Sequence, residues 1–113
     1  MATRSVLRAL MADPEPMVAE ACLVNARLTE DELVAAVRRD TAPRALLEAA
    51  AVSPRWADSY ALRVALALQP RAPVAVALAQ LTRLLDRDLR LVAATPGLVP
   101  VVQAAAERVL AGR

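Results

Sequence analysis

The sequence contains no histidine, no lysine and no phenylalanine, and it has only two glycines in 113 residues. Without histidine, Ser-His-Asp and Cys-His catalysis are excluded, and so are most zinc sites. Gly97 and Gly112 are too few for a glycine-rich phosphate-binding loop. The residue types that catalysis most often needs are therefore missing, and the sequence predicts a protein that is not an enzyme and holds no metal and no cofactor.

A single cysteine, Cys22, excludes an internal disulfide and any cysteine-rich metal site. It lies among Ala21, Leu23 and Val24, a setting typical of a small buried apolar side chain. We expect reduced, cytoplasmic surroundings. The longest uncharged run, 91–106, is too short for a membrane span and is interrupted by prolines and a glycine.

Apolar residues make up 58% of the chain but aromatic residues only 2%, so the core must consist of leucine, valine and alanine. These residues suit closely packed helices, and the scarcity of other strand formers argues against an all-β fold. All 14 basic residues are arginine, as is typical of a GC-rich bacterial genome. Since the net charge is only +2 and arginines alternate with acidic residues, nucleic acid is not favoured as a partner.

Three apolar segments each end on a short polar residue followed by proline, at Asp13-Pro14, Ser53-Pro54 and Thr95-Pro96. The prolines are 54 − 14 = 40 and 96 − 54 = 42 positions apart. Aspartate, serine and threonine are good N-cap residues, and proline is well suited to the first position of a helix. The pattern therefore predicts a repeat of about forty residues, with a new helix beginning at each of these prolines.

A second correspondence pairs the turn 24–29 with 68–73, where an amide residue is followed two positions later by Arg27 or Arg71. Thr29 and Glu32 form a capping-box pattern at the next helix start. Gly112 is expected to cap the last helix. The predicted helices cover 4–12, 14–25, 30–40, 43–52, 55–69, 74–85, 87–94 and 98–111, in a long, medium and short order within each unit.

The two-to-three-helix unit, the Asn/Gln-x-Arg turns and the closing segment Val102–Leu110 resemble HEAT and armadillo repeats, in particular divergent bacterial HEAT-like proteins. The resemblance covers residues 1–113. It implies an all-α fold, a short right-handed α-solenoid of about two and a half repeats with roughly eight helices in a single domain. One interpretation is that the chain is an excised part of a longer protein. Such families imply a non-catalytic scaffold that binds a protein partner.

Five residues are candidates for binding a partner. Trp56 and Arg55, with Tyr60 one turn later, are of the types found at binding hot spots, although packing at a seam between units is the favoured alternative for Trp56. Arg27 and Arg71 would form a ladder along one edge if the repeats superpose, and could then hold carboxylates or phosphates. Capping of helix carbonyls is the favoured alternative for these arginines.

The acidic cluster Glu30-Asp31-Glu32 is explained by its place in the first turn of a helix. Two functions follow: a protein-interaction module, and, as the alternative, binding of nucleic acid or an anionic ligand through an arginine-lined face. Exposed repeat faces could also hold two copies together as a homodimer.

Overall fold

The computed structural model describes residues 4–113, and over this range the chain forms eight α-helices and one 3-10 turn, with no strand. The prediction of an all-helical chain with about eight helices is confirmed. The elements in chain order are α1 (Arg4–Met11), α2 (Pro16–Leu23), α3 (Glu30–Val37), α4 (Arg44–Val52), the turn η1 (Pro54–Trp56), α5 (Tyr60–Leu68), α6 (Val74–Leu81), α7 (Asp86–Ala94) and α8 (Pro100–Ala111).

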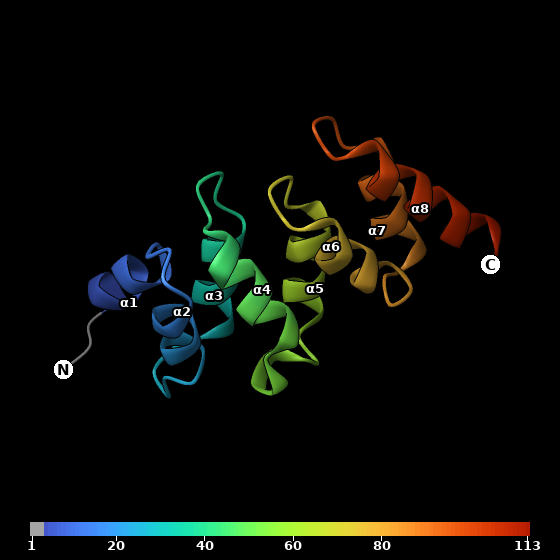
Figure 1. Cartoon of the computed structure of the whole chain (residues 1–113). Coiled ribbons are helices and arrows are strands. Elements are labelled where there is room, and N and C mark those ends of the chain that lie inside the picture. The colour runs from blue at the N-terminus through green and yellow to red at the C-terminus, as the bar shows by residue number, and fades with distance from the viewer. Residues whose placement is uncertain (1–3) are drawn as a thin grey trace.

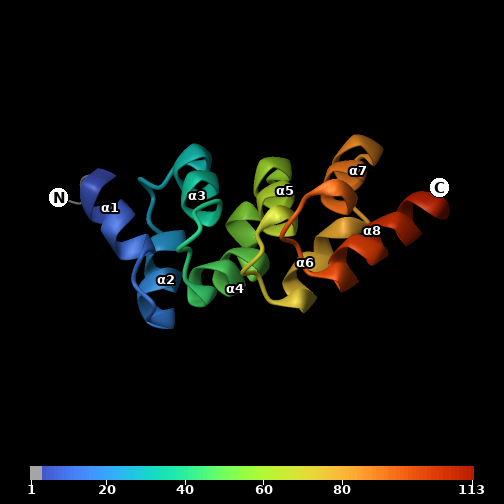
Figure 2. The same ribbon diagram turned by 90° about the horizontal axis from the view of Figure 1, so that it is seen from above.

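The helices alternate between two layers. Figure 2 shows α1, α3, α5 and α7 along one layer and α2, α4, α6 and α8 along the other, and neighbours within each layer are in contact. The connections consequently lie along two edges of an elongated molecule of 49 × 24 × 18 Å. In Figure 1 the connections α3–α4, α5–α6 and α7–α8 lie along the upper edge, and α2–α3, α4–α5 and α6–α7 along the lower edge.

The core divides into two clusters that meet at α5. The first cluster holds the buried leucines and alanines of α2, α3 and α4, and α5 contributes Leu62, Ala65 and Leu66 to it. The second cluster is formed by α6, α7 and α8, with Ala67 from α5. Each fully buried leucine stabilises the fold by about 1.5–3 kcal/mol. Because α5 supplies both clusters, it joins the two halves of the stack.

Two of the predicted helix caps are confirmed. The Thr29 hydroxyl accepts a hydrogen bond from the Glu32 N–H at 3.2 Å, and the Thr29 N–H donates to the Glu32 carboxylate at 3.1 Å, which completes the capping box. Gly112 occupies the C-cap of α8. In α7, Asp86 is the first helical residue and Leu85 holds the N-cap position.

The prediction that helices begin at Pro14 and Pro96 is wrong, because a second proline follows in each case. A residue that precedes proline is disfavoured in the helical region. Glu15 is accordingly extended (φ −73°, ψ 125°) before Pro16, and Val99 (φ −59°, ψ 130°) before Pro100, so α2 and α8 begin at these later prolines.

Asp13 and Thr95, which were predicted to cap the helices after Pro14 and Pro96, make other hydrogen bonds. Asp13 accepts a hydrogen bond from the Glu15 N–H at 2.8 Å within the connection. The Thr95 hydroxyl donates to the carbonyl of Leu91 at 2.6 Å, closing the end of α7. Gly97 follows with φ +87°, a left-handed conformation that side chains rarely adopt.

The predicted helix 55–69 is also interrupted. Pro54 starts only the short turn η1, and α5 begins at Tyr60 because the Ser59 hydroxyl accepts a hydrogen bond from the Leu62 N–H at 3.2 Å and caps a new helix. Residues 57 and 58 form a turn between them. This break places Arg55 and Trp56 in the 3-10 turn, outside α5.

The predicted order of long, medium and short helices is not observed. Seven helices have eight or nine residues, and only α8 has twelve. The geometry repeats every two helices instead. Arg44 and Val74, which begin α4 and α6 in the same layer, are 74 − 44 = 30 positions apart. Pro14 and Pro54 are three helices apart, so they occupy connections of opposite direction.

Candidate functional site

Arg55 and Trp56 clamp the α4–α5 connection onto the α2–α3 connection. The Arg55 guanidinium donates to the carbonyls of Asn25 at 2.5 Å, Leu28 at 2.9 Å and Leu23 at 3.3 Å. The indole N–H of Trp56 also donates to the Leu23 carbonyl at 3.3 Å. The Cζ atom of Arg55 lies over the Trp56 ring, 4.5 Å from its centre, which is the geometry of a cation–π interaction. Both side chains are thus engaged within the chain, with Trp56 half-buried against the first core cluster.

Tyr60 is directed toward α7 and away from Trp56. Its hydroxyl donates to the carboxylate of Asp88 and accepts from the Leu85 N–H at 2.9 Å. Burial, followed by the hydrogen bond to Asp88, raises the pKa of the Tyr60 phenol above its ordinary value. The phenol therefore remains protonated and serves to fix α5 against the start of α7.

Arg27 and Arg71 do not form a ladder. Arg27 is exposed in the α2–α3 connection at the lower edge, whereas Arg71 is exposed in the α5–α6 connection at the upper edge (Figure 1). The two turns are nevertheless alike, since the Arg27 N–H donates to the Asn25 side chain at 2.9 Å and the Arg71 N–H to the Gln69 side chain at 3.1 Å. The sequence correspondence reflects one type of turn in two places.

Gln69 is a structural residue that the sequence did not single out. It is only 4% exposed, and its amide donates to the carbonyls of Val37 at 2.6 Å and Arg39 at 2.9 Å. Arg71 supports it by donating to the Asp40 carbonyl at 3.1 Å. At the upper edge, side chains of the α5–α6 connection thus hold the α3–α4 connection. At the lower edge, Arg55 of the α4–α5 connection holds the α2–α3 connection in the same way.

The lower edge carries a row of arginines that the sequence analysis missed. Arg27, Arg55, Arg83 and Arg113, here called the lower-edge arginines, are spaced by 55 − 27 = 28, 83 − 55 = 28 and 113 − 83 = 30 positions. Arg113 repeats the behaviour of Arg55, donating to the carbonyls of Leu84 at 2.7 Å and Thr82 at 3.1 Å. It also forms an ion pair with Asp86 at 2.8 Å. A search at the two-helix period would have found this row.

A shallow groove of about 550 Å³ crosses the outer side of α2, α4 and α6. We call it the even-layer groove. Its apolar lining comes from Pro14 in the α1–α2 connection, Pro16 at the start of α2, and Ala45, Ala49, Val52 and Val76. The ion pair of Arg44 with Glu48 (2.7 Å) lies among its polar lining residues. Val52 is 79% exposed, and nearby on α2 Met17 is 81% and its C-cap Val24 77% exposed.

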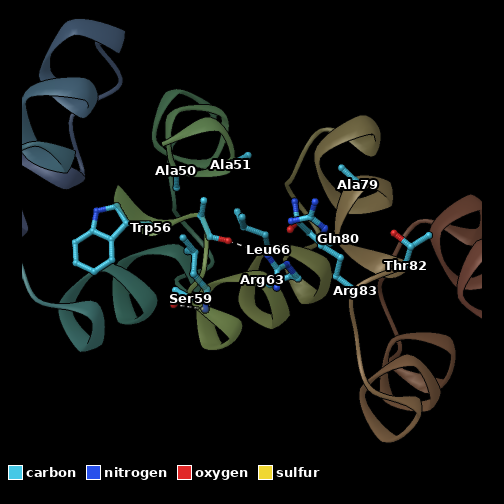
Figure 3. Close-up of a pocket in the computed structure, with 12 residues that line it drawn as sticks. Ala50, Ala51, Trp56, Ser59, Arg63, Leu66, Ala79, Gln80, Thr82 and Arg83 are labelled. Atoms are coloured by element: carbon cyan, nitrogen blue, oxygen red, sulfur yellow. Dashed lines mark hydrogen bonds between the residues drawn. The ribbon is translucent and has the colours of Figure 1, made fainter. Parts of the chain in front are cut away.

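A second hollow of about 360 Å³ lies where the two core clusters meet, between α4, η1, α5 and the end of α6. We call it the seam cleft. Figure 3 shows Arg63, Gln80 and Arg83 near one another in this cleft, with Ala50, Ala51 and Trp56 farther toward α4. The Nε–H of Arg63 is buried and has no hydrogen-bond partner among residues 4–113.

The described residues hold no group of three or more side chains suited to a metal ion. Glu30, Asp31 and Glu32 lie in the first turn of α3, where Glu32 closes the capping box and Glu30 accepts from the Ser59 hydroxyl at 2.7 Å. Cys22 is buried, and burial, followed by the charge of Asp13, raises the pKa of its thiol. A raised pKa disfavours the reactive thiolate.

In the described part of the chain, no helix is long and apolar enough to cross a membrane. Comparison with known proteins found no matching protein-family model, no matching curated protein and no matching solved structure.

Proposed function

We propose that the chain is a non-catalytic protein-interaction module, a short right-handed α-solenoid of the HEAT/armadillo-like kind. The observation that carries the proposal is the outer side of the even layer. There the even-layer groove runs across three helices, and Met17, Val24 and Val52 are each about four-fifths exposed. Val52 lines this groove, and Met17 and Val24 belong to α2 and its C-cap, the helix at one end of the groove. Single exposed apolar residues are ordinary on a protein surface, but a groove with exposed apolar residues on its helices favours a binding surface.

The two-layer stack also suits this role, because stacked helix pairs present extended surfaces that span several repeats. The unit is the two-helix pair of about thirty residues, so four pairs replace the two and a half units expected from the prolines. Arg55, Trp56 and Tyr60 hold neighbouring pairs together. Of the candidate residues, Arg27, Arg55 and Arg71 are exposed, and Arg55 and Arg71 also donate to backbone carbonyls of other connections.

The test compares matched substitutions on the two layers. Proteins captured by the wild-type chain from its native cell extract are purified, and their affinity is measured for wild type, Val52→Glu and Leu91→Glu. Leu91 lies on α7 in the other layer and is 49% exposed, so both changes place a carboxylate on an exposed apolar position. We expect Val52→Glu to weaken binding at least about tenfold, in the range of a binding hot spot, while Leu91→Glu binds as wild type.

Equal affinities for all three proteins would place the binding surface elsewhere and remove the observation on which the proposal depends. Loss of binding in both variants, with unchanged thermal unfolding, would argue against a surface confined to the even layer. Arg27→Glu and Arg71→Glu, measured in the same assay, test the two exposed candidate arginines.

A further inference from the structure

Arg83 differs from Arg55 and Arg113, two other lower-edge arginines, in the hydrogen bonds that its guanidinium makes. Arg55 and Arg113 each donate to carbonyls of the preceding connection at the lower edge. The connection that precedes Arg83 at the lower edge is α4–α5, and there the carbonyl of Ala57 already accepts a hydrogen bond from Arg63, at 2.8 Å. The Arg83 guanidinium makes no hydrogen bond or ion pair with residues 4–113 and lines the seam cleft instead.

The seam cleft combines this cation with a second one and with apolar walls. Its charged lining residues are Arg63 and Arg83, with no carboxylate among them. Glu30, whose carboxylate accepts a hydrogen bond from the lining residue Ser59 at 2.7 Å, and Asp58, the chain neighbour of Ala57 and Ser59, are not among the lining residues. The apolar lining residues include Ala50, Ala51, Leu62, Leu66, Ala79 and Trp56. Ala50, Leu62 and Leu66 are buried, so Ala51, Ala79 and Trp56 supply accessible apolar surface.

Arg63 adds an independent indication of a missing partner. A buried donor without an acceptor costs about 1–3 kcal/mol, and here the donor is the Nε–H of a charged group. A carboxylate offers two oxygens that match the planar fork of a guanidinium. An anion in the cleft would give Arg63, after a small rotation, the acceptor that the protein does not provide.

We propose that the seam cleft binds a carboxylate carried on a short aliphatic group. The carboxylate lies between the guanidinium groups of Arg63 and Arg83, and the aliphatic part covers the accessible side chains of Ala51, Ala79 and Trp56. A bare inorganic anion would satisfy the arginines but leave the accessible apolar surface of Ala51, Ala79 and Trp56 in water. The cleft volume of about 360 Å³ suits a ligand of this size.

Two sources offer this chemistry: a free small carboxylic acid, and the glutamate side chain of a partner protein. The site is distinct from the even-layer groove, and a free carboxylate tests it without any partner. Its failure would therefore leave the protein-binding proposal untouched.

Trp56 is the only tryptophan in the chain and lines the cleft, so its fluorescence and its indole N–H resonance give one signal that a ligand in the cleft should change. The probes are 3-methylbutanoate, its neutral amide, inorganic phosphate, and capped Ala-Glu-Ala and Ala-Gln-Ala tripeptides. For ligands of this size we expect a Kd of about 1 mM for the better carboxylate, weakening as salt is added.

The variants are Arg83→Gln and, as a control with the same change in charge, Arg90→Gln on α7. Arg83 and Arg90 are both exposed, so neither change should alter folding, which a thermal melt verifies. We expect Arg83→Gln to raise the Kd about tenfold or more, as for a lost charge-assisted hydrogen bond, and Arg90→Gln to leave it unchanged.

Tighter binding of 3-methylbutanoate than of the glutamate peptide assigns the site to a free acid, and the reverse order assigns it to a protein side chain. The proposal is overturned if neither carboxylate gives a saturable signal, if the neutral amide or the glutamine peptide binds as well, if phosphate binds as tightly, or if Arg83→Gln binds like wild type.

Discussion

Gln69 connects three backbone groups at the upper edge, and its replacement offers a direct measure of how neighbouring helix pairs are held together. Its amide N–H groups donate to the carbonyls of Val37 and Arg39, and its oxygen accepts from the Arg71 N–H. The side chain is 4% exposed, so water cannot replace it freely. Gln69→Ala would leave two carbonyls and one N–H without their partner.

The expected loss is about 3 kcal/mol. The Val37 carbonyl lies in a buried hydrogen bond, and a buried group left unpaired costs about 1–3 kcal/mol. The bonds to Arg39 and from Arg71 are partly buried, so each contributes about 0.5–1 kcal/mol. Since a chain of this size has a total stability of about 5–15 kcal/mol, the loss would be plain in a denaturation curve.

Urea unfolding followed by circular dichroism gives the free energy of unfolding for wild type, Gln69→Ala, Gln69→Leu and Gln80→Ala. Gln80 is the control, because its amide donates only to Val76 one turn earlier in its own helix, at 3.0 Å. We expect that change to stay within about 0.5 kcal/mol of wild type. Gln69→Leu loses the same hydrogen bonds but keeps the side-chain volume, and the burial of its apolar atoms offsets about 1 kcal/mol, so it should be destabilised by about 2 kcal/mol.

A Gln69→Leu protein as stable as wild type would refute the reasoning, because the loss in Gln69→Ala would then come from a cavity. A loss below about 1 kcal/mol in Gln69→Ala would likewise mean that the carbonyls find other partners.

Two further predictions concern the lower edge and the pH dependence. Arg55→Ala should lower the free energy of unfolding by about 1–2 kcal/mol and shift the Trp56 emission. Arg27→Ala, the control, should change the free energy of unfolding by less than about 0.5 kcal/mol. Equal effects of the two changes in urea unfolding would contradict the clamp. The raised pKa values of Cys22 and Tyr60 mean that the unfolded chain loses these protons first, so the stability they contribute is complete below the ordinary pKa values of 9.0 and 10.0 and declines above them. Thermal melts should show Tm falling as pH rises past about 9, with a shallower fall in a Cys22→Ala/Tyr60→Phe protein, and a Tm that stays level would count against both shifts.

The helices themselves were predictable because each depends on local sequence. Helix-ending turns and capping residues indicated all eight, and the Thr29–Glu32 pair marked one start to the residue. The errors arose where two local signals compete. Pro14 and Pro16 both suit a helix start, and Ser53 and Ser59 both suit an N-cap; in each case the later residue begins the α-helix. Sequence patterns alone do not rank such neighbours.

The hydrogen-bond partners of the candidate arginines could not be predicted from the neighbouring sequence. Arg55 and Arg71 bind carbonyls about thirty positions earlier in the chain, and such a contact depends on which connections share an edge. The edge is decided by whether the number of helices between two connections is odd or even. The spacing of 44 between Arg27 and Arg71 spans three helices and therefore placed them on opposite edges.

The lower-edge arginines illustrate how one repeated position acquires two uses. Between α2 and α4, buried residues such as Leu23, Leu46 and Leu47 bring the helices together, and Arg55 reaches the carbonyls of the preceding connection. Between α4 and α6 the core clusters separate, α6 contributes only Ala77 and Leu81 as buried residues, and Arg63 binds the carbonyl of Ala57. Arg83 keeps the position but lacks the acceptor. A break in packing thus converts a structural arginine into one available to a ligand.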